Sequence, residues 1–370
     1  MKMQTAQRVL PYAPSEILAG LEWTGPASRY PGSGSDMHWH AWGDDDALYV
    51  IDSDGVNFDR PWNFAHVLRV TGTPPEHEIE YLTNVPELVR PDSWLKRRYP
   101  DGALAVGSRL YIAAYDYVYD HEETGRPLWL ADAISRHGGI AGIMWSDDYG
   151  RTWNGAPDAD TPYFLGPRFA GLAFVGFGPG YTGVPRGLDG YVYAISNDGS
   201  WESGDHVFLA RMPRDRVLDR AAWEFRAGDG WTGDEEAAEP VVSDPGYVGH
   251  PTMTWNPGLG RFLLAFGSDS VPQPYDTPPE VAQATWHRRR ELKVLEAPGP
   301  WGPFGLVHYD PAWEGEHVAY LPQIPQKWLA PDGLSGWMAY SGDYNKFVEA
   351  PSDYESFYGF MTRPFQLLPR

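Results

Sequence analysis

Cysteine is absent from the 370-residue sequence, and long runs of apolar residues are absent too. The first absence excludes disulfide bonds, a cysteine nucleophile and thiolate metal sites. The second leaves no segment that could span a membrane, and the first residues, MKMQTAQRVLPYAPSE, lack the apolar core of a signal peptide. We therefore expect a soluble protein without a membrane partner. It is expected to be cytoplasmic as the sequence stands, and secreted or periplasmic if a leader has been removed.

Basic residues are scarce. The sequence has 29 lysines and arginines against 50 aspartates and glutamates, and its net charge is −21. Such an acidic surface repels phosphate backbones, so nucleic acid is a poor candidate partner and a polyanionic polysaccharide is disfavoured as a substrate. No phosphate-binding loop and no G-x-G-x-x-G between a strand and a helix are present. We therefore expect no nucleotide and no other cofactor.

Glycine, proline and aromatic residues are abundant instead, with 41 Gly, 35 Pro and an aromatic share of 15%. Glycine and proline form turns, while aromatic residues favour strands. Disordered chains lack aromatic residues, so disorder is not expected. The composition predicts an all-β protein with many short strands.

A repeated unit is first seen in residues 35–55, SDMHWHAWGDDDALYVIDSDG. Residues 37–42 and 48–51 are predicted strands around an aspartate-rich turn. Units with the same order of polar cluster, strand, turn and aromatic strand occupy 35–70, 99–153, 167–213, 249–268 and 324–343. Radial repetition buries the faces of each sheet against its neighbours. The pattern predicts a five-bladed β-propeller that forms a single domain over residues 1–370, in which residues 1–30 help to close the ring.

The segments around these units have local predictions of their own. The expected elements are an outer strand at 65–72, a connector at 75–88, a helical turn at 91–98, a short helical connector at 216–225, a helix at 277–294 and a last outer strand at 357–369. The run His287–Arg290 is interpreted as the solvated face of that helix.

Residues Ser146 to Trp153, SDDYGRTW, fit the Asp-box pattern S-x-D-x-G-x-T-W. In this pattern the aspartate caps turn amides, the glycine adopts an unusual backbone conformation and the tryptophan packs beneath the hairpin. We interpret the box as a structural turn rather than a catalytic one.

The order of motifs resembles a bacterial propeller family of formerly unknown function, some members of which are endo-D-arabinanases. The resemblance covers most of the chain. It rests on Ser35-Asp36-Met37-His38-Trp39, Trp42-Gly43-Asp44-Asp45, Leu48-Tyr49, Phe174-Val175-Gly176-Phe177-Gly178 with Tyr181, Asp189-Gly190-Tyr191-Val192-Tyr193, Leu209-Ala210-Arg211-Met212-Pro213, Trp255-Asn256-Pro257-Gly258-Leu259-Gly260-Arg261-Phe262, Ala297-Pro298-Gly299-Pro300-Trp301-Gly302-Pro303-Phe304 and Lys327-Trp328-Leu329-Ala330-Pro331-Asp332-Gly333.

This resemblance implies a five-bladed propeller that acts on a carbohydrate, as a glycoside hydrolase. Two departures from the family pattern bear on the reaction. Met-His-Trp-His follows Asp36 where the family has Trp-Pro, and His250 is an added histidine in the fourth unit.

Residues at the starts of the innermost strands of a propeller converge on its axis. The starts expected here carry Asp36 with His38, Asp101, Arg168, His250, and Gln326 with Lys327. Glycoside hydrolysis needs two carboxyl groups, one protonated as the acid and one ionised as the base or nucleophile. The likeness to five-bladed glycosidases implies that Asp36 is the base. Asp101 is expected as an accessory or partner carboxylate.

The general acid is left open among Asp189, Glu202 and Asp54. The catalytic candidates are therefore Asp36, Asp101, His38, His250 and Glu202. The substrate-binding candidates are Trp39, His40, Arg168, Tyr181, Asp189, Gln326 and Lys327. Trp42, Tyr115 and Trp201 are further aromatic residues that could stack on sugar faces, although most aromatic side chains simply pack.

Two other functions remain open. A polysaccharide lyase would use a His or Tyr base and an Arg or Lys that neutralises a uronate, and its candidates are His38, His250, Arg168, Lys327 and Tyr181. A non-catalytic glycan-binding propeller would use the aromatic residues alone. A metal bound by His38, His40 and His250 is disfavoured because no third ligand stands at a recognised spacing, so no metal is expected.

Overall fold

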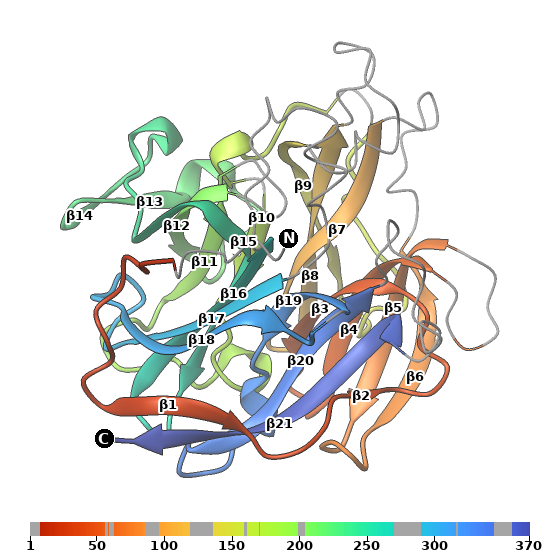
Figure 1. Ribbon diagram of the computed structural model, residues 1–370. Coiled ribbons are helices and arrows are strands. Elements are labelled where there is room, and N and C mark those ends of the chain that lie inside the picture. The colour runs from red at the N-terminus through yellow and green to blue at the C-terminus, as the bar shows by residue number, and fades with distance from the viewer. Residues whose placement is uncertain are drawn as a thin grey trace, which may run out of the picture.

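The computed structural model describes residues 8–55, 58, 63–85, 96–118, 136–158, 161–169, 171–198, 204–269, 290–315, 317–343 and 357–370. Within these residues the chain forms four antiparallel β-sheets around a common centre, and the nine-stranded sheet supplies two of the five blades (Figure 1). The regular helices of the described residues are short 3₁₀ turns. No helix among them is both long and apolar enough to cross a membrane.

The first two blades follow each other in sequence. Blade 1 contains β3 (Asp36–Trp42), β4 (Leu48–Gly55), β5 (Asn63–Thr71) and β6 (Glu78–Asn84). Blade 2 contains β7 (Lys96–Val106), β8 (Arg109–Val118) and β9 (Arg136–Ser146).

Blades 3 and 4 share one long strand. Blade 3 contains β10 (Gly171–Phe174), β11 (Tyr191–Asn197) and β12 (Gly204–Pro213), with a side hairpin of β13 (Glu224–Ala227) and β14 (Gly230–Thr232). The first part of β15 (Val242–Asn256) pairs with β12. Its second part pairs with β16 (Arg261–Asp269), which is followed by β17 (Arg290–Ala297) and β18 (Gly305–Trp313). One strand therefore ends blade 3 and begins blade 4.

Blade 5 joins the two ends of the chain. It contains β19 (Val318–Gln323), β20 (Ser335–Asp343) and β21 (Gly359–Pro369). The N-terminal β1 (Leu18–Trp23) pairs with β21 as its outermost long strand, and the short β2 (Ser28–Arg29) also pairs with β21. The first strands contact one another in the order β3, β7, β10, β15, β19 and back to β3, which closes the ring. The predicted five-bladed β-propeller is confirmed.

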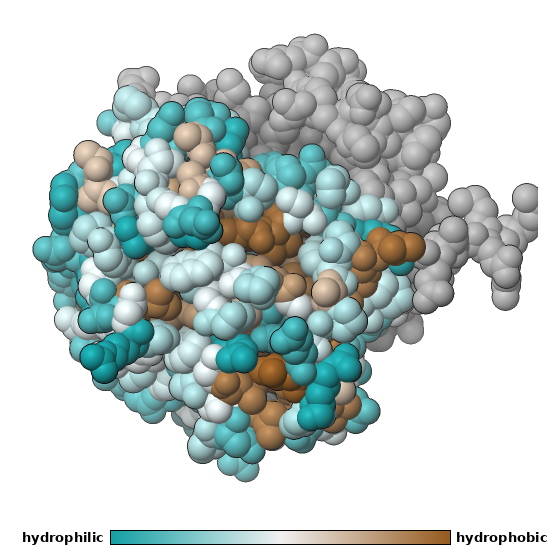
Figure 2. Space-filling view, turned by 90° about the vertical axis from the view of Figure 1, so that its left-hand side faces the viewer, coloured by the Kyte–Doolittle hydropathy of each residue, from teal (hydrophilic) through white to brown (hydrophobic). Residues whose placement is uncertain are grey.

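Strands buried on both faces explain why this sequence forms stacked blades. In β4, Leu48 and Val50 pack on one face against Trp328 of blade 5, whereas Tyr49 and Ile51 belong to the large core on the other face. Successive side chains of a strand point to opposite faces, so an unbroken apolar run suits a strand with a sheet on each side. The described part of the face in Figure 2 is mostly hydrophilic, with apolar residues in separate patches.

Two local predictions were wrong. Residues 78–84, taken for part of a connector, form the fourth strand of blade 1, so 65–72 is not its outer strand. The end of the expected helix at 277–294 is the buried strand β17, while residues 277–289 lie outside the described residues. Local sequence preference is easily overridden when a segment can pair with a neighbouring strand, and in both cases this pairing determined that the segment forms a strand.

Candidate functional site

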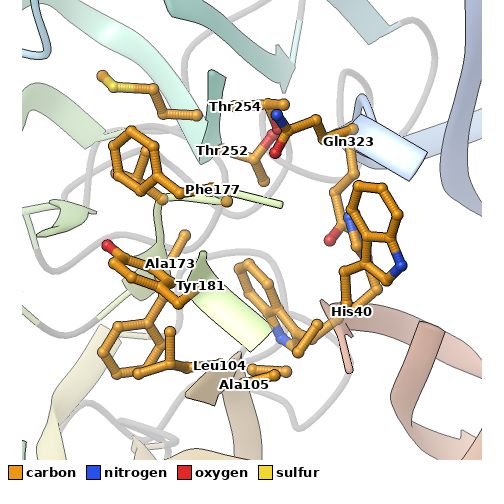
Figure 3. Close-up of a pocket in the computed structure, with 18 of the residues that line it drawn as sticks. His40, Leu104, Ala105, Ala173, Phe177, Tyr181, Thr252, Thr254 and Gln323 are labelled. Carbon is orange, nitrogen blue, oxygen red and sulfur yellow. The ribbon is translucent and has the colours of Figure 1, made fainter. Parts of the chain in front are cut away.

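The five first strands surround a narrow central channel. Neighbouring first strands run in the same direction, as the parallel bridge between Gly176 and Thr254 shows. Figure 3 looks into the cavity along this channel, with His40 and Gln323 on one side and Phe177, Ala173 and Tyr181 on the other. Its volume is about 50 Å³. Ligand pockets usually measure roughly 300–1,000 Å³, so this channel is too small to hold a molecule of the size of a sugar ring.

The two ends of the channel differ in backbone conformation. We call the end that lies before the channel-lining residues of the first strands the N-terminal end, and the end beyond them the C-terminal end. In blades 1, 2, 4 and 5 the first strand carries a break in register directly before its first channel-lining residue: Asp36/Trp39, Asp101/Ala103, Gly249/Thr252 and Tyr320/Gln323. Bulges of this kind bend a strand and re-aim its side chains, and they are frequent beside active sites.

Three of these bulges hold a non-glycine residue at positive φ. The φ angles are 54° at Met37, 45° at His250 and 53° at Leu321. Such conformations cost of order 1–3 kcal/mol each and cluster at functional sites. No local sequence signal predicted these bulges, because Met, His and Leu are not residues that favour positive φ.

Asp36 lies at the bulge that opens β3. Its side chain is half-buried, and Ser53 Oγ on the neighbouring β4 donates a hydrogen bond of 2.8 Å to Asp36 Oδ1. The register pairs Asp36 with Ser53, so the backbone of Asp54 is next to this site. The side chain of Asp54 lies outside the described part of the structure, as do Glu202 and Trp201.

Asp101 lies at the corresponding bulge of β7, in the next blade. The residue is 2% exposed, and the backbone N–H of Leu172 on β10 donates to Asp101 Oδ2. Burial raises the pKa of Asp101 well above its ordinary value, although hydrogen bonds from the amides of Leu172 and Gly102 oppose the shift. A Cβ at Gly102 would collide with the Leu172 carbonyl, so this close approach of two blades requires glycine.

The predicted histidines occupy three different environments. His38 is fully buried between blades 1 and 5, with Ser35 and Ser341 as partners. His40 lines the channel, where burial lowers its pKa to about 4. His250 is 4% exposed and packs against Tyr320, with 6.0 Å between ring centroids. Among the described residues, the three histidines do not form a group with the spacing of metal ligands.

Four predicted binding residues lie at the C-terminal end instead. Gln326 accepts from the Gly178 N–H, and Lys327 Nζ pairs with Asp46 Oδ1 at 2.6 Å. Tyr181 is buried and its hydroxyl accepts from Tyr193 N–H, while its pKa is raised by burial. Asp189 precedes β11, the second strand of blade 3, and accepts from Gly187 N–H within a turn. The structure therefore does not bring these residues to Asp36 and Asp101.

Trp39 and Arg168 complete the predicted set. Trp39 lines the channel and is 3% exposed. Arg168 precedes β10, but its guanidinium donates to the Ala238 carbonyl, pairs with Glu236 and lies over the Phe208 ring. It thus faces the outer strands of blade 3. The residues proposed for a lyase are accordingly dispersed rather than gathered at one end.

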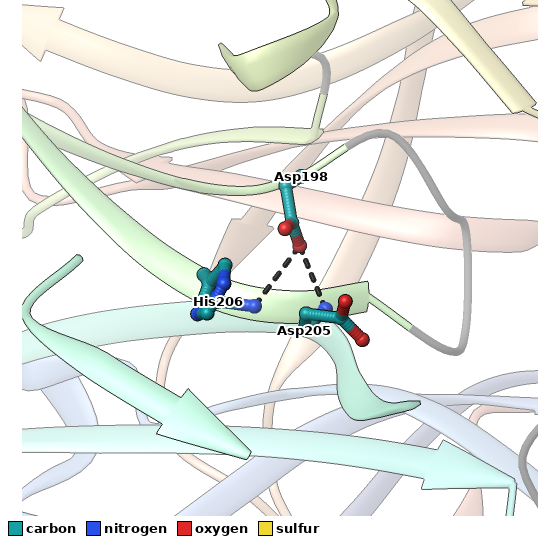
Figure 4. A group of neighbouring side chains, drawn as sticks. All are labelled: Asp198, Asp205 and His206. Atoms are coloured by element: carbon teal, nitrogen blue, oxygen red, sulfur yellow. Dashed lines mark hydrogen bonds between the residues drawn. The ribbon is translucent and has the colours of Figure 1, made fainter. Parts of the chain in front are cut away.

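A group of possible cation ligands, missed by sequence reasoning, consists of Asp198, Asp205 and His206 (Figure 4). Asp198 Oδ1 accepts from the backbone N–H of Asp205 at 2.7 Å and of His206 at 2.9 Å. Asp205 Oδ1 accepts from Gly246 N–H, and His206 Nδ1 contacts Ser243 Oγ at 2.9 Å. These bonds join β11, β12 and β15, and they account for the cluster as a local tie between strands.

The predicted Asp box is a turn held by its own side chains. Asp148 Oδ1 accepts from Ser146 Oγ and from Thr152 N–H, both at 2.8 Å, and Trp153 Nε1 donates to the Gly150 carbonyl. Gly150 has a φ of 83°. The turn follows β9, the third strand of blade 2, and therefore lies at the C-terminal end of the blade.

Comparison with known proteins places the chain in a family. Residues 52–319 match the family described as "Domain of unknown function (DUF4185)", and the chain belongs to this family. The matched range includes Asp101 and His250 but begins after Asp36. No curated protein matches the sequence.

Solved structures share the fold at low sequence identity. A proposed hydrolase from Bacteroides ovatus is 13% identical, with a TM-score of 0.52, over 92% of this chain and 87% of its own. The catalytic domain of a family 62 α-L-arabinofuranosidase from Coprinopsis cinerea is 7% identical, with a TM-score of 0.46, over 94% and 97%. A glycoside hydrolase family 43 enzyme from Xanthomonas citri is 13% identical, with a TM-score of 0.47, over 92% and 90%.

Proposed function

We propose that the protein is a glycoside hydrolase that binds an oligo- or polysaccharide at the N-terminal end of the channel. The observation that carries the proposal is that two carboxyl groups in unlike surroundings lie at this end. Asp36 is half-buried at the bulge of one blade, and Asp101 is buried at the bulge of the next. Glycosidases need two carboxyl groups whose environments keep one ionised and the other protonated.

The two groups have separate roles in this proposal. Asp36 retains contact with solvent and a hydrogen bond from Ser53, which suits an ionised base or nucleophile. Asp101 keeps its proton to higher pH because it is buried, and it supports the reaction as an acid or as an accessory carboxyl group.

The substrate class follows from charge and size. The net charge of −21 disfavours a polyanionic glycan, so a neutral polysaccharide is the better substrate. The channel is too narrow for a sugar ring, so the chain of sugars crosses its N-terminal end.

The experiment is a screen of the purified protein on neutral and acidic plant, algal and mycobacterial glycans. Release of reducing ends and absorbance of unsaturated products are recorded together, for the wild type, Asp36→Asn and His250→Ala. We expect reducing ends without absorbance, and a loss of at least about 1,000-fold in Asp36→Asn.

Absorbance that depends on His250 would instead identify a lyase and reject the hydrolase. Glycan binding without turnover, unchanged in Asp36→Asn, would identify a binding propeller.

A further inference from the structure

A chain of buried polar side chains lies directly behind Asp36. It connects Ser341 on β20, His38 and its neighbour Ser35 beside the bulge of β3, Asp52 on β4 and His66 on β5. All five side chains are fully buried. Buried polar groups are costly unless they are hydrogen-bonded, so a chain of this length requires a reason.

The hydrogen-bond directions along this chain are determined by its two ends. Ser35 Oγ donates its one hydrogen to Asp52 Oδ2 at 2.7 Å, so toward His38 Nε2, at 3.2 Å, it can only accept, and Nε2 carries a proton. The backbone N–H of His38 donates to Ser341 Oγ at 3.2 Å, and the same oxygen lies 2.9 Å from His38 Nδ1. Because burial lowers the pKa of His38 to about 4, the ring is neutral at physiological pH, and Nδ1 accepts from the Ser341 hydroxyl.

Asp52 anchors the far end of the chain. Its Oδ1 accepts from the backbone N–H of His66 at 3.1 Å and from His66 Nδ1 at 2.7 Å. Together with Ser35, three donors hold this carboxylate in place.

The chain fixes the residues on both sides of Asp36. Ser35 precedes it and is held by Asp52, whereas His38 follows two positions later and is held by Ser341. The carbonyl of His38 also accepts from Gln323 Nε2 at 2.6 Å. Met37, which lies between Asp36 and His38, has a φ of 54°. A strained bulge persists only where its surroundings determine it, and these bonds supply that constraint.

We infer that His38 is a positioning residue: the buried chain Ser341–His38–Ser35–Asp52–His66 clamps the bulge of β3 and thereby aims the Asp36 carboxylate at the N-terminal end of the channel. The effect of His38 on catalysis rests on the proposed function, whereas its effect on the conformation of the bulge does not. His38 does not touch the substrate, and it acts only through Asp36.

The test compares Ser341→Ala with Ser146→Ala. Both variants remove a buried hydroxyl that makes side-chain hydrogen bonds, but Ser146 belongs to the Asp box of blade 2. On a glycan that the wild type hydrolyses, kcat should fall about 10- to 100-fold in Ser341→Ala with KM changed less than twofold. In Ser146→Ala both constants should stay within twofold of the wild type. His38→Gln, which keeps a donor and an acceptor, should retain more activity than His38→Ala.

A second measurement needs no substrate. Nitrogen-15 NMR should show His38 as the neutral Nε2–H tautomer in the wild type, and a changed tautomer ratio in Ser341→Ala. Carbon-13 titration of aspartate carboxyl groups, with Asp36→Asn for assignment, should show a shifted Asp36 titration in Ser341→Ala but not in Ser146→Ala.

An Asp36 titration that is identical in the wild type and Ser341→Ala would overturn the inference, whatever the activity. Equal loss of kcat in the two serine variants would overturn it as well. If no glycan is hydrolysed but the NMR differences are found, the proposed function fails and the positioning of Asp36 stands.

Discussion

Both ends of the central channel carry charged side chains, but their surroundings differ. At the C-terminal end, Lys327 pairs with Asp46, and Asp189 caps its own turn. At the N-terminal end, Asp36 and Asp101 lie on strand bulges, and burial shifts the pKa of Asp101. Positive φ angles occur at both ends, at Asp46 and Tyr181 as well as at Met37 and His250, so backbone strain alone does not distinguish them. The buried carboxyl group of Asp101, whose pKa is raised, lies at the N-terminal end, and groups of this kind cluster at functional sites, which supports the proposal that the chemistry takes place there.

The largest expected difference between the two ends concerns their carboxyl groups. Asp101→Asn removes a buried group that can exchange a proton, and glycan hydrolysis should fall about 100-fold or more. Asp189→Asn is the same substitution at an exposed aspartate of the opposite end and should leave kcat/KM within twofold. Initial rates on the best glycan of the screen measure both.

The same Asp101→Asn variant should not lose stability at pH 7. The folded-state pKa of Asp101 is raised, so its ionisation favours the unfolded chain at neutral pH, and asparagine removes this penalty.

Equal losses of activity in Asp101→Asn and Asp189→Asn, or a loss in Asp189→Asn alone, would contradict the proposal that the reaction takes place at the N-terminal end of the channel.

A smaller effect is expected from His77 at the C-terminal end, and only on stability. Its ring packs against Tyr30, Trp328 and Phe360, and burial lowers its pKa to about 4. Between pH 6.5 and 4 the unfolded chain binds a proton here that the folded protein does not, so stability is complete above pH 6.5 and falls as the pH drops. His77→Phe should therefore retain about 2 kcal/mol more stability than the wild type at pH 4, a figure reduced for partial solvent contact.

Denaturant unfolding at pH 7 and pH 4 measures this effect. Hydrolysis at pH 7 should be unchanged in His77→Phe. A pH dependence identical to that of the wild type would show that His77 titrates normally in the folded protein.

The smallest effect is expected from Lys327. Its ion pair with Asp46 has a length of 2.6 Å, but Asp46 is largely exposed. The Lys327 side chain is 8% exposed, but the solvent around Asp46 screens the pair, so Lys327→Ala should lower the free energy of unfolding by about 1 kcal/mol. KM should stay within twofold, as measured on the same glycan. A large rise in KM would place a substrate subsite at the C-terminal end and weaken the contrast between the ends.

The sequence predicted the repeated units well because their signals are local. Apolar runs such as 48–51 and turns such as 43–47 are set by neighbouring residues, and the five units became five blades. Asp36 and Asp101 were both predicted as starts of inner strands; Asp36 does open β3, whereas Asp101 lies in the middle of β7, and both lie at bulges. Errors arose where strand pairing overrode local appearance, as in β6 and β17.

Only the tertiary structure decided which candidate residues lie together. Successive strands of a blade run in opposite directions. A polar residue at the start of a first strand therefore lies at one end of the channel, whereas a polar residue at the start of a second strand lies at the other end. Asp36 opens the first strand of blade 1, whereas Asp189 precedes the second strand of blade 3. The sequence by itself determined the blades, because turns and alternation are local. It did not determine the site, because the end of the channel that a residue reaches depends on pairing between distant strands.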